Sequence, residues 1–257
     1  MTVWMGTSGW NYAHWRGGLY PRSVKTADWL GHYAARFATV ELNNSFYRLP
    51  ERSTFEQWAA AVPDDFVFAV KASRYLTHIK RLKQSGEPVH RLMERATGLG
   101  SKLGPLLVQL PPNLKIDIPS LDETLGHFPK GVRVAVEFRH ESWYVPEVEQ
   151  LLRSHGAALC HTDVDGPRQP HWQTADWGYV RFHHGRARPE SCYGPSALNT
   201  WADRLAGTWT VDADLFVYFN NDLHSCAPRN ARQMATALEH RGMTVTRVPA
   251  VRSVPFT

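Results

Sequence analysis

Eight short apolar runs recur along the chain, and each is followed within a few positions by polar or charged residues. Runs of this length are typical of strands that are buried on both faces, as in a parallel sheet. The run Val132–Val136 shows the pattern clearly, because it leads into Glu137 and Arg139. The predicted strands are Val3–Gly6, Thr39–Leu42, Val67–Val70, Leu106–Leu110, Val132–Val136, Ala157–His161, Tyr179–Phe182 and Leu215–Phe219.

Helical segments separate most of these strands. We expect helices over about 27–37, 53–61, 89–98, a segment after Ser120, 146–155, 197–205, and from about 228 to before Gly242. Thr26 is the expected N-cap of the first, and capping boxes are predicted at Ser53 with Glu56 and at Ser120 with Glu123. The link between the sixth and seventh strands is short and proline-rich, which predicts a sixth helix that is short or missing.

Alternation of strands and helices predicts an α/β fold, and eight such repeats predict a closed (β/α)8 TIM barrel. A length of 257 residues is typical of one barrel. No linker marks off a second region, so residues 1–257 are predicted to form a single domain. An open doubly wound sheet is the alternative, but no glycine-rich dinucleotide-binding fingerprint follows an early strand.

Composition narrows the class of protein. Hydrophobic residues make up 43% of the chain and charged residues 21%, which are ordinary globular values. No apolar run approaches the length of a membrane span, and the N-terminus leads directly into a strand without the features of a secretory signal. The three cysteines never occur as C-x-x-C, which argues against a disulfide framework or a cysteine-rich zinc site and predicts a cytoplasmic protein. Cys160 lies in an apolar run and is expected in the core.

The chain carries a formal net charge of +5 and a sequence pI of about 9.2. This balance favours anionic partners, such as a small phosphate-bearing substrate or nucleic acid, although many basic enzymes never bind nucleic acid. No membrane partner is expected, and the sequence does not determine an oligomeric state.

Seven segments carry a resemblance to a known family. They read GTSGWNYAHWRGGLYP, VELNNSFYRLP, FAVKASRYLTHIKRL, LGPLLVQLPPN, VAVEFRHESWY, YVRFHHG and VYFNND, and they extend over nearly the whole chain. The chain resembles the YecE-like domain-of-unknown-function family. The resemblance implies a TIM barrel and no particular activity, because the role of the family is not settled. His161-Thr162-Asp163 departs from the family pattern, in which a small apolar pair more often precedes the Asp.

Nearly every predicted strand ends in polar residues, and TIM-barrel active sites lie at these carboxyl ends. We therefore expect Glu41, Lys71, Glu137, Arg139 and Arg181 to converge on one water-accessible cavity. The alternative is a self-satisfied polar plug, in which the glutamates pair with the basic residues and leave no room for a ligand.

The residue types at the strand ends point to acid–base chemistry on an anion. The candidate catalytic carboxylates are Glu137, which is favoured, Glu41 and Asp163. The cationic groups suit phosphate or carboxylate, and amide, imidazole and aromatic groups could complete the site. The candidate substrate-binding or anion-binding residues are Lys71, Arg139, Arg181, His183, Asn43, Gln109, Asn220, Asn221, Tyr12 and Tyr47.

No cofactor is predicted, and a divalent metal is kept as an alternative. Its ligands would be His161, Asp163 and His183, with Glu137 as a fourth, a set that suits Zn or Mn. Against it, the chain has neither an H-x-H nor an H-E-x-x-H spacing.

Three functions are compatible with these residues. The leading hypothesis is an enzyme, such as a hydrolase or phosphodiesterase, that binds a phosphate-bearing substrate at the barrel mouth. A non-catalytic nucleic-acid-binding protein is the second, using the basic run Arg74–Lys83 and the loop aromatics, although such a run is often only a solvated helix face. A glycoside hydrolase that uses Glu41 and Glu137 is the third, but the cationic mouth argues against it.

Overall fold

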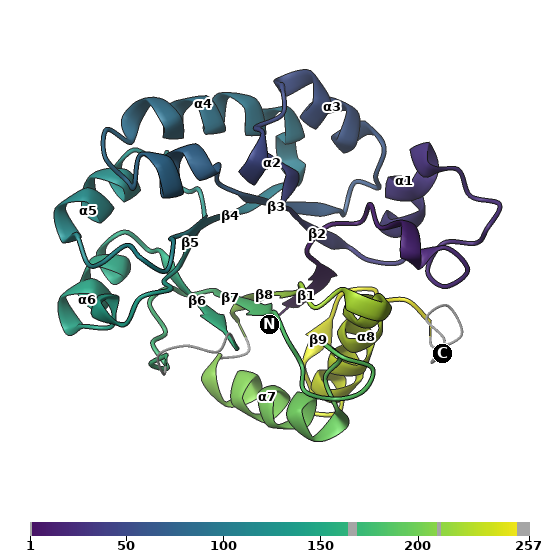
Figure 1. Ribbon diagram of the computed structural model, residues 1–257. Coiled ribbons are helices and arrows are strands. Elements are labelled where there is room, and N and C mark those ends of the chain that lie inside the picture. Colours follow the sequence, from purple (N-terminus) through teal and green to yellow (C-terminus); the bar gives the residue numbers. More distant parts are fainter. Residues whose placement is uncertain (1, 164–168, 210–211, 251–257) are drawn as a thin grey trace. The chain divides into compact units, whose positions relative to one another are not determined.

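The computed structural model describes residues 2–163, 169–209 and 212–250 (Figure 1). The strands are β1 (Thr2–Thr7), β2 (Thr39–Leu42), β3 (Val67–Lys71), β4 (Leu103–Gln109), β5 (Val134–Glu137), β6 (Ala158–Thr162), β7 (Gly178–Phe182), β8 (Asp214–Phe219) and β9 (Thr244–Val245). All eight predicted strands are confirmed within a few positions, and β9 is an addition. Their hydrogen-bonded order is β2-β3-β4-β5-β6-β7-β8-β1-β9. A parallel sheet whose strands follow one another in chain order is the arrangement of a TIM barrel, as predicted.

Helices alternate with these strands. They are α1 (Trp29–Ala34), α2 (Asn44–Tyr47), α3 (Arg52–Ala60), α4 (Gly86–Ala96), α5 (Ile118–Gly126), α6 (Pro146–Ser154), α7 (Pro195–Thr208) and α8 (Cys226–Glu239). A π-helix over Tyr75–Ile79 and short 3-10 turns such as Ala13–Trp15 and Leu223–Ser225 complete the set. The described residues between β6 and β7 contain no helix, as predicted for the sixth position. None of the helices in these ranges combines the length and apolar character that crossing a bilayer requires.

The three predicted helix caps are wrong, whereas α6 begins at Pro146 as predicted. Asp28 is the N-cap of α1, and Thr26 lies in a 3-10 turn before it. Ser53 lies inside α3, which begins at Arg52. Asp117 caps α5, because its Oδ1 accepts a hydrogen bond from the Ser120 amide at 3.2 Å. An aspartate three residues upstream thus takes the capping role that was predicted for Ser120.

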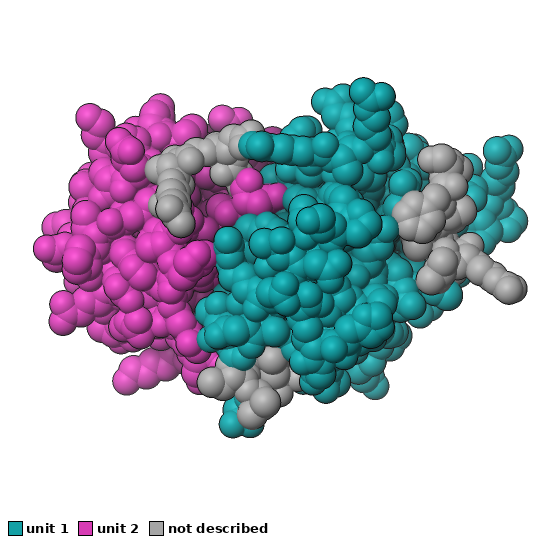
Figure 2. Space-filling view, turned by 90° about the horizontal axis from the view of Figure 1, so that it is seen from below, with its two compact units in different colours: residues 1–41, 61–67, 180–257 teal, residues 42–60, 68–179 magenta. Residues whose placement is uncertain are grey.

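The chain divides into two compact units, which Figure 2 colours separately. The first unit comprises residues 1–41, 61–67 and 180–257, and the second comprises residues 42–60 and 68–179. Strands β2, β3 and β7 each continue from one unit into the other. The single-domain organisation stays a prediction.

The first unit is organised around β1 and β8, which pair in parallel from Thr2 with Asp214 to Thr7 with Phe219. Helix α8 packs against both strands and against α7. Gly6 marks a close approach between β1 and β2, because a Cβ there would lie 2.4 Å from the carbonyl oxygen of Thr39. A larger residue would push these strands apart, so this glycine sets the spacing at the start of β2.

The second unit is organised around β4, β5 and β6. Register pairs Leu106 with Val134 and Gln109 with Glu137, so these two polar residues end adjacent strands side by side. All four residues of β5 are buried, including Glu137. Helix α3 packs against α4 and against the 3-10 turn Thr97–Lys102. The local sequence thus places a carboxylate in a fully buried strand, where it needs a partner.

Candidate active site

The ends of β1, β2 and β7 in the first unit meet at Glu41. This carboxylate is fully buried, and its Oε1 accepts hydrogen bonds from Ser8 Oγ at 2.7 Å and from Arg181 Nη2 at 2.9 Å. Arg181 is itself only 1% exposed. Removing two charges from water is costly, and the direct ion pair is what offsets that cost. Glu41 and Arg181 are therefore held together as a buried unit.

From Arg181 the contacts continue to His183 and Asn220. Arg181 Nη1 lies 3.5 Å from His183 Nε2, and Asn220 Nδ2 lies 3.2 Å from His183 Nδ1. His183 and Asn220 are half-buried and follow β7 and β8 directly. Both residues therefore extend the buried ion pair towards the surface at the ends of these two strands.

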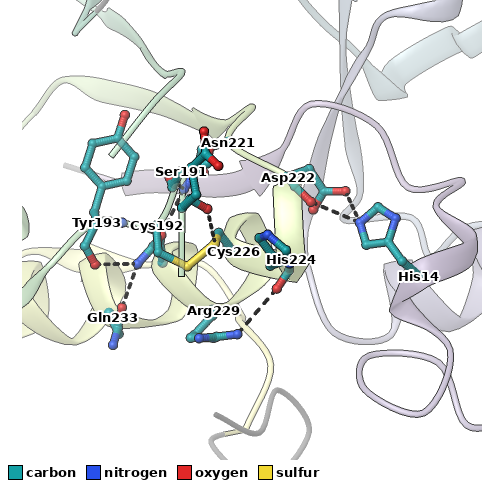
Figure 3. Close-up of a disulfide and its surroundings, with 12 residues drawn as sticks. His14, Ser191, Cys192, Tyr193, Asn221, Asp222, His224, Cys226, Arg229 and Gln233 are labelled. Carbon is teal, nitrogen blue, oxygen red and sulfur yellow. Dashed lines mark hydrogen bonds and ion pairs between the residues drawn. A yellow bond between two sulfur atoms is a disulfide. The ribbon is translucent and has the colours of Figure 1, made fainter. Parts of the chain in front are cut away.

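His14 and Asp222 form a second polar contact in the first unit (Figure 3). His14 Nε2 lies 2.7 Å from Asp222 Oδ2 and 3.0 Å from the Asp222 carbonyl oxygen, while Trp15 Nε1 donates to Oδ1 at 2.8 Å. The Asp222 side chain is 11% exposed and that of His14 is 48% exposed. Burial raises the pKa of Asp222 to about 6, and His14 opposes part of that shift. The result is an accessible imidazole that is oriented by a mostly buried carboxyl group.

Backbone conformation next to Asp222 is unusual. His224 and Ser225 have φ values of 59° and 56°, in the left-handed region that costs non-glycine residues free energy. Ser225 Oγ donates to the His14 carbonyl oxygen at 3.3 Å, and Cys226 is in a disulfide with Cys192 (Figure 3). These tethers keep a strained segment in place directly beside the His14–Asp222 contact.

The disulfide corrects a sequence-based expectation. Isolated cysteines argued against disulfides, but Cys192 and Cys226 are bonded across a sequence separation of 34, with their Cα atoms 5.0 Å apart. The loop after β7 brings Cys192 to the start of α8, a proximity that no spacing rule reveals. Cys160 is buried and free of a disulfide, as predicted for a core residue.

Tyr12 connects the two groups of contacts. Its hydroxyl donates to the Ser8 carbonyl oxygen at 2.6 Å, and its ring centroid lies 5.6 Å from that of His14. The two groups are also joined through the backbone, because Asn220 of the first group and Asp222 of the second are only two positions apart. The contacts therefore form a closed ring. We call this set the strand-end ring; it consists of Tyr12, His14, Ser8, Glu41, Arg181, His183, Asn220 and Asp222.

Sequence reasoning missed His14. It lies in the aromatic loop after β1, and its partner Asp222 follows β8, 208 positions further along the chain. The only signal was the polar end of β8, where Asp222 stands out, because nothing local distinguishes His14 from other surface histidines. Asn221 was predicted to bind substrate, but its Nδ2 donates to the Ser191 carbonyl oxygen and to Asn230 Oδ1.

Two predicted residues of the second unit, Gln109 and Arg139, contact Glu137. Its Oε1 accepts a hydrogen bond from Gln109 Nε2 at 2.8 Å and is ion-paired with Arg139 Nη2. Cys160 Sγ lies 3.9 Å from Oε2. Lys71 is buried and lies over the Phe46 ring, 4.1 Å from its centroid. Glu137 is thus surrounded by donors, much as Glu41 is in the first unit.

The remaining candidates are dispersed. Tyr47 is 76% exposed, and Asn43 is half-buried at the start of α2. His161 is buried, with its Nε2 3.1 Å from the Trp172 carbonyl oxygen, and Asp163 is half-buried beyond β6. Within the described ranges, no three His, Cys, Asp or Glu side chains are grouped to hold a metal ion.

Both buried glutamates are paired with an arginine, as the plug alternative supposed. Glu41 pairs with Arg181 in the first unit, and Glu137 pairs with Arg139 in the second. Convergence of the five predicted side chains on one cavity stays a prediction, because they are divided between the units.

Comparison with known proteins agrees with the resemblance seen in the seven segments. The UPF0759 protein YunF of Bacillus subtilis is 25% identical over 270 residues, covering 92% of this chain and 95% of that protein. The UPF0759 protein YecE of Escherichia coli K12 is 28% identical over 153 residues, covering 58% of this chain and 53% of YecE.

A solved structure extends the agreement to three dimensions. The crystal structure of a DUF72 family protein from Thermotoga maritima matches with a TM-score of 0.80 and 29% identity, over 93% of this chain and 100% of that one. The family model described as "Protein of unknown function DUF72" matches residues 4–253. The YecE-like resemblance is thereby confirmed, and this chain belongs to the DUF72 family.

Proposed function

We propose that this protein is an enzyme that binds a phosphate-bearing anion at the strand-end ring and transfers a proton through His14. The observation that carries the proposal is the half-exposed His14 imidazole held by buried Asp222, within the same ring of contacts as the buried cation Arg181. Phosphoester hydrolysis is the reaction that this combination of an anion site and a proton-transfer group serves best.

His14 has the arrangement of a general base. Its Nε2 faces Asp222, so Nδ1 is the ring nitrogen left to accept a proton from water or a substrate hydroxyl. A carboxylate behind an imidazole selects the tautomer and stabilises the imidazolium that forms. In hydrolysis, His14 would take a proton from the water whose oxygen forms a new bond to phosphorus. The P–O ester bond would break, and His14 would pass the proton to the leaving oxygen.

The proposed anion site lies at the ends of β7 and β8. In TIM barrels the loops after the seventh and eighth strands frequently hold phosphate. Arg181 is enclosed and engaged by Glu41, so it positions His183 rather than contacting the anion itself. His183 and Asn220 are half-buried, so they are the members of this part of the ring that solvent can reach.

The sequence assigned acid–base roles to Glu137, Glu41 and Asp163, and these assignments stay predictions. Each of these two glutamates is paired with an arginine, which favours a positioning role over proton transfer. Glu41 positions Arg181, and Glu137 positions Arg139, each within its own unit.

The test is a panel of phosphate monoesters and diesters with the purified protein and the variants His14→Gln, Asp222→Asn and His240→Gln. His240 is an exposed histidine at the end of α8, outside the ring, and serves as the control. We expect His14→Gln to lower kcat by about 100-fold or more with little change in KM. Equal turnover by His14→Gln and His240→Gln would remove His14 from the mechanism, and no turnover of any ester by the wild type would remove the proposed activity.

A further inference from the structure

A cavity in the second unit shares no lining residue with the strand-end ring. Its volume is about 490 Å³, and it is lined by α2 with the segment that follows it, by both ends of the π-helix, and by residues of α4 from Glu87 to Arg95. Pockets of a few hundred Å³ suit ligands of small-molecule size. We call it the arginine–tyrosine pocket; its polar and aromatic lining includes Tyr47, Arg48, Arg74, Tyr75, Arg91 and Arg95.

Exposed apolar side chains concentrate at this pocket. Among the described residues, Tyr47, Tyr75, Ile79, Ile116 and Leu223 are the large hydrophobic side chains that lie exposed. The first three line this one pocket, with Tyr47 76%, Tyr75 41% and Ile79 59% exposed. Single exposed hydrophobic residues are normal on a protein surface, but a cluster at the rim of a cavity marks a binding site.

The pocket carries an excess of positive charge. Four arginines line it against two glutamates, and those glutamates pair with Arg91 and Arg95. Arg48 and Arg74 are exposed and have no carboxylate partner within the described ranges. Each is adjacent in sequence to an exposed tyrosine, in the pairs Tyr47-Arg48 and Arg74-Tyr75. A flat ring and a guanidinium are thus presented together on two sides of the pocket.

Further cations lie around His78, next to the pocket. His78 packs edge-on against Phe46, which lines the pocket, with ring centroids 5.0 Å apart. Its pKa is lowered by burial and, to a smaller extent, by Lys71, Arg74 and Arg81. The π-helix that carries Tyr75 is a rare conformation that occurs frequently at functional sites.

We propose that the arginine–tyrosine pocket binds a nucleoside monophosphate or a closely similar aromatic phosphate. The ring of the ligand stacks on Tyr47 or Tyr75, and its phosphate is held by Arg48 and Arg74. A mononucleotide has both an aromatic base, which suits the tyrosines, and a phosphate, which suits the arginines. The volume of the cavity suits one such molecule rather than a nucleic-acid strand. This site is separate in its residues from the strand-end ring and does not depend on the activity proposed there.

Calorimetric titration with adenosine 5′-monophosphate tests the proposal, with adenosine and inorganic phosphate as probes that each lack one of the two groups. We expect the monophosphate to bind at least about tenfold more tightly than either partial probe. Stacking on an aromatic side chain contributes about five- to hundredfold in affinity, so at least one of Tyr47→Ala and Tyr75→Ala should weaken monophosphate binding by a factor in that range. Tyr47→Phe keeps the ring and should retain most of the affinity.

Arginine variants test the phosphate half of the site. Arg74→Gln and Arg48→Gln should weaken monophosphate binding about tenfold each and leave adenosine binding unchanged. Arg153→Gln is the matched control, because Arg153 is an exposed arginine of the same unit on α6, away from the pocket.

Three outcomes overturn the proposal. One is wild-type protein that does not bind the monophosphate at millimolar concentration. Another is unchanged affinity in both Tyr47→Ala and Arg74→Gln. The third is a single-stranded oligonucleotide that binds more than about 100-fold more tightly than the monophosphate, because the ligand would then be a nucleic-acid strand.

Discussion

The strand-end ring of the first unit and the arginine–tyrosine pocket of the second both gather arginine, and they use it differently. In the ring, Arg181 is 1% exposed and bonded to a buried glutamate. In the pocket, Arg48 and Arg74 are exposed and lie beside exposed tyrosines. A buried, paired cation organises its neighbours and contributes to stability only as part of its pair. An exposed cation with no carboxylate partner contributes little to stability and is accessible to a ligand.

The largest effect should come from breaking the buried pair. Arg181→Met leaves Glu41 as an uncompensated buried charge, and we expect it to lower the free energy of unfolding by about 3–5 kcal/mol. Chemical denaturation measures this. The double variant Glu41→Gln with Arg181→Met should recover a large part of the loss, whereas a double variant as unstable as the sum of the singles would contradict the pairing. Arg153→Ala, which breaks an exposed pair on α6, should cost less than about 1 kcal/mol.

The next effect concerns the tether beside the ring. A disulfide that closes a loop of this length stabilises a protein by about 2–4 kcal/mol. The double variant Cys192→Ser with Cys226→Ser should lose a similar amount, and a reducing agent should destabilise the wild type but not the variant. Equal sensitivity of both to reduction would contradict the bond. A cytoplasmic location stays a prediction. Because disulfides are rare in the reducing cytosol, alkylation of thiols in intact cells would show whether Cys192 and Cys226 are bonded there.

A smaller effect, a change of folding stability with pH, is expected from Asp222 in the His14–Asp222 contact. Asp222 has a folded-state pKa of about 6, above its ordinary value of 3.8. Between these values the folded state binds more protons than the unfolded state, so the stability that Asp222 contributes falls as pH rises from about 4 to 6. Relative to Asp222→Asn, the wild type should therefore lose stability over this window and remain level above it, as followed by denaturation at each pH. If the wild type instead gained stability relative to Asp222→Asn as pH rises over this window, the raised pKa would be contradicted.

The smallest effect should come from the pocket. Arg74→Gln and Tyr47→Ala remove exposed side chains, so each should change the free energy of unfolding by less than about 0.5 kcal/mol. If either variant unfolds at clearly lower denaturant concentration, the side chain has a structural role and the contrast with the ring is weaker. Ligand binding by the same variants provides the complementary measurement.

Much of the fold followed from local patterns. The runs around Val136 and Val217 predicted buried parallel strands because burial on both faces excludes polar residues over several consecutive positions. Polar strand ends predicted where chemistry would gather, since parallel strands place their carboxyl ends on one side. Helix starts were less accurate, because several residues near each start can cap, and Asp117 rather than Ser120 does so in α5.

Partner choice was decided only by the tertiary structure. Nothing local pairs Glu41 with Arg181 across 140 positions, His14 with Asp222, or Cys192 with Cys226. Hydrophobic periodicity indicates whether a side chain is buried, because burial depends mainly on the strand or helix that carries the side chain. The partner of that side chain is set by how strands and loops far apart in the chain pack together. The sequence by itself therefore determined the strands and the character of their ends, and the packed structure determined which of those ends act together.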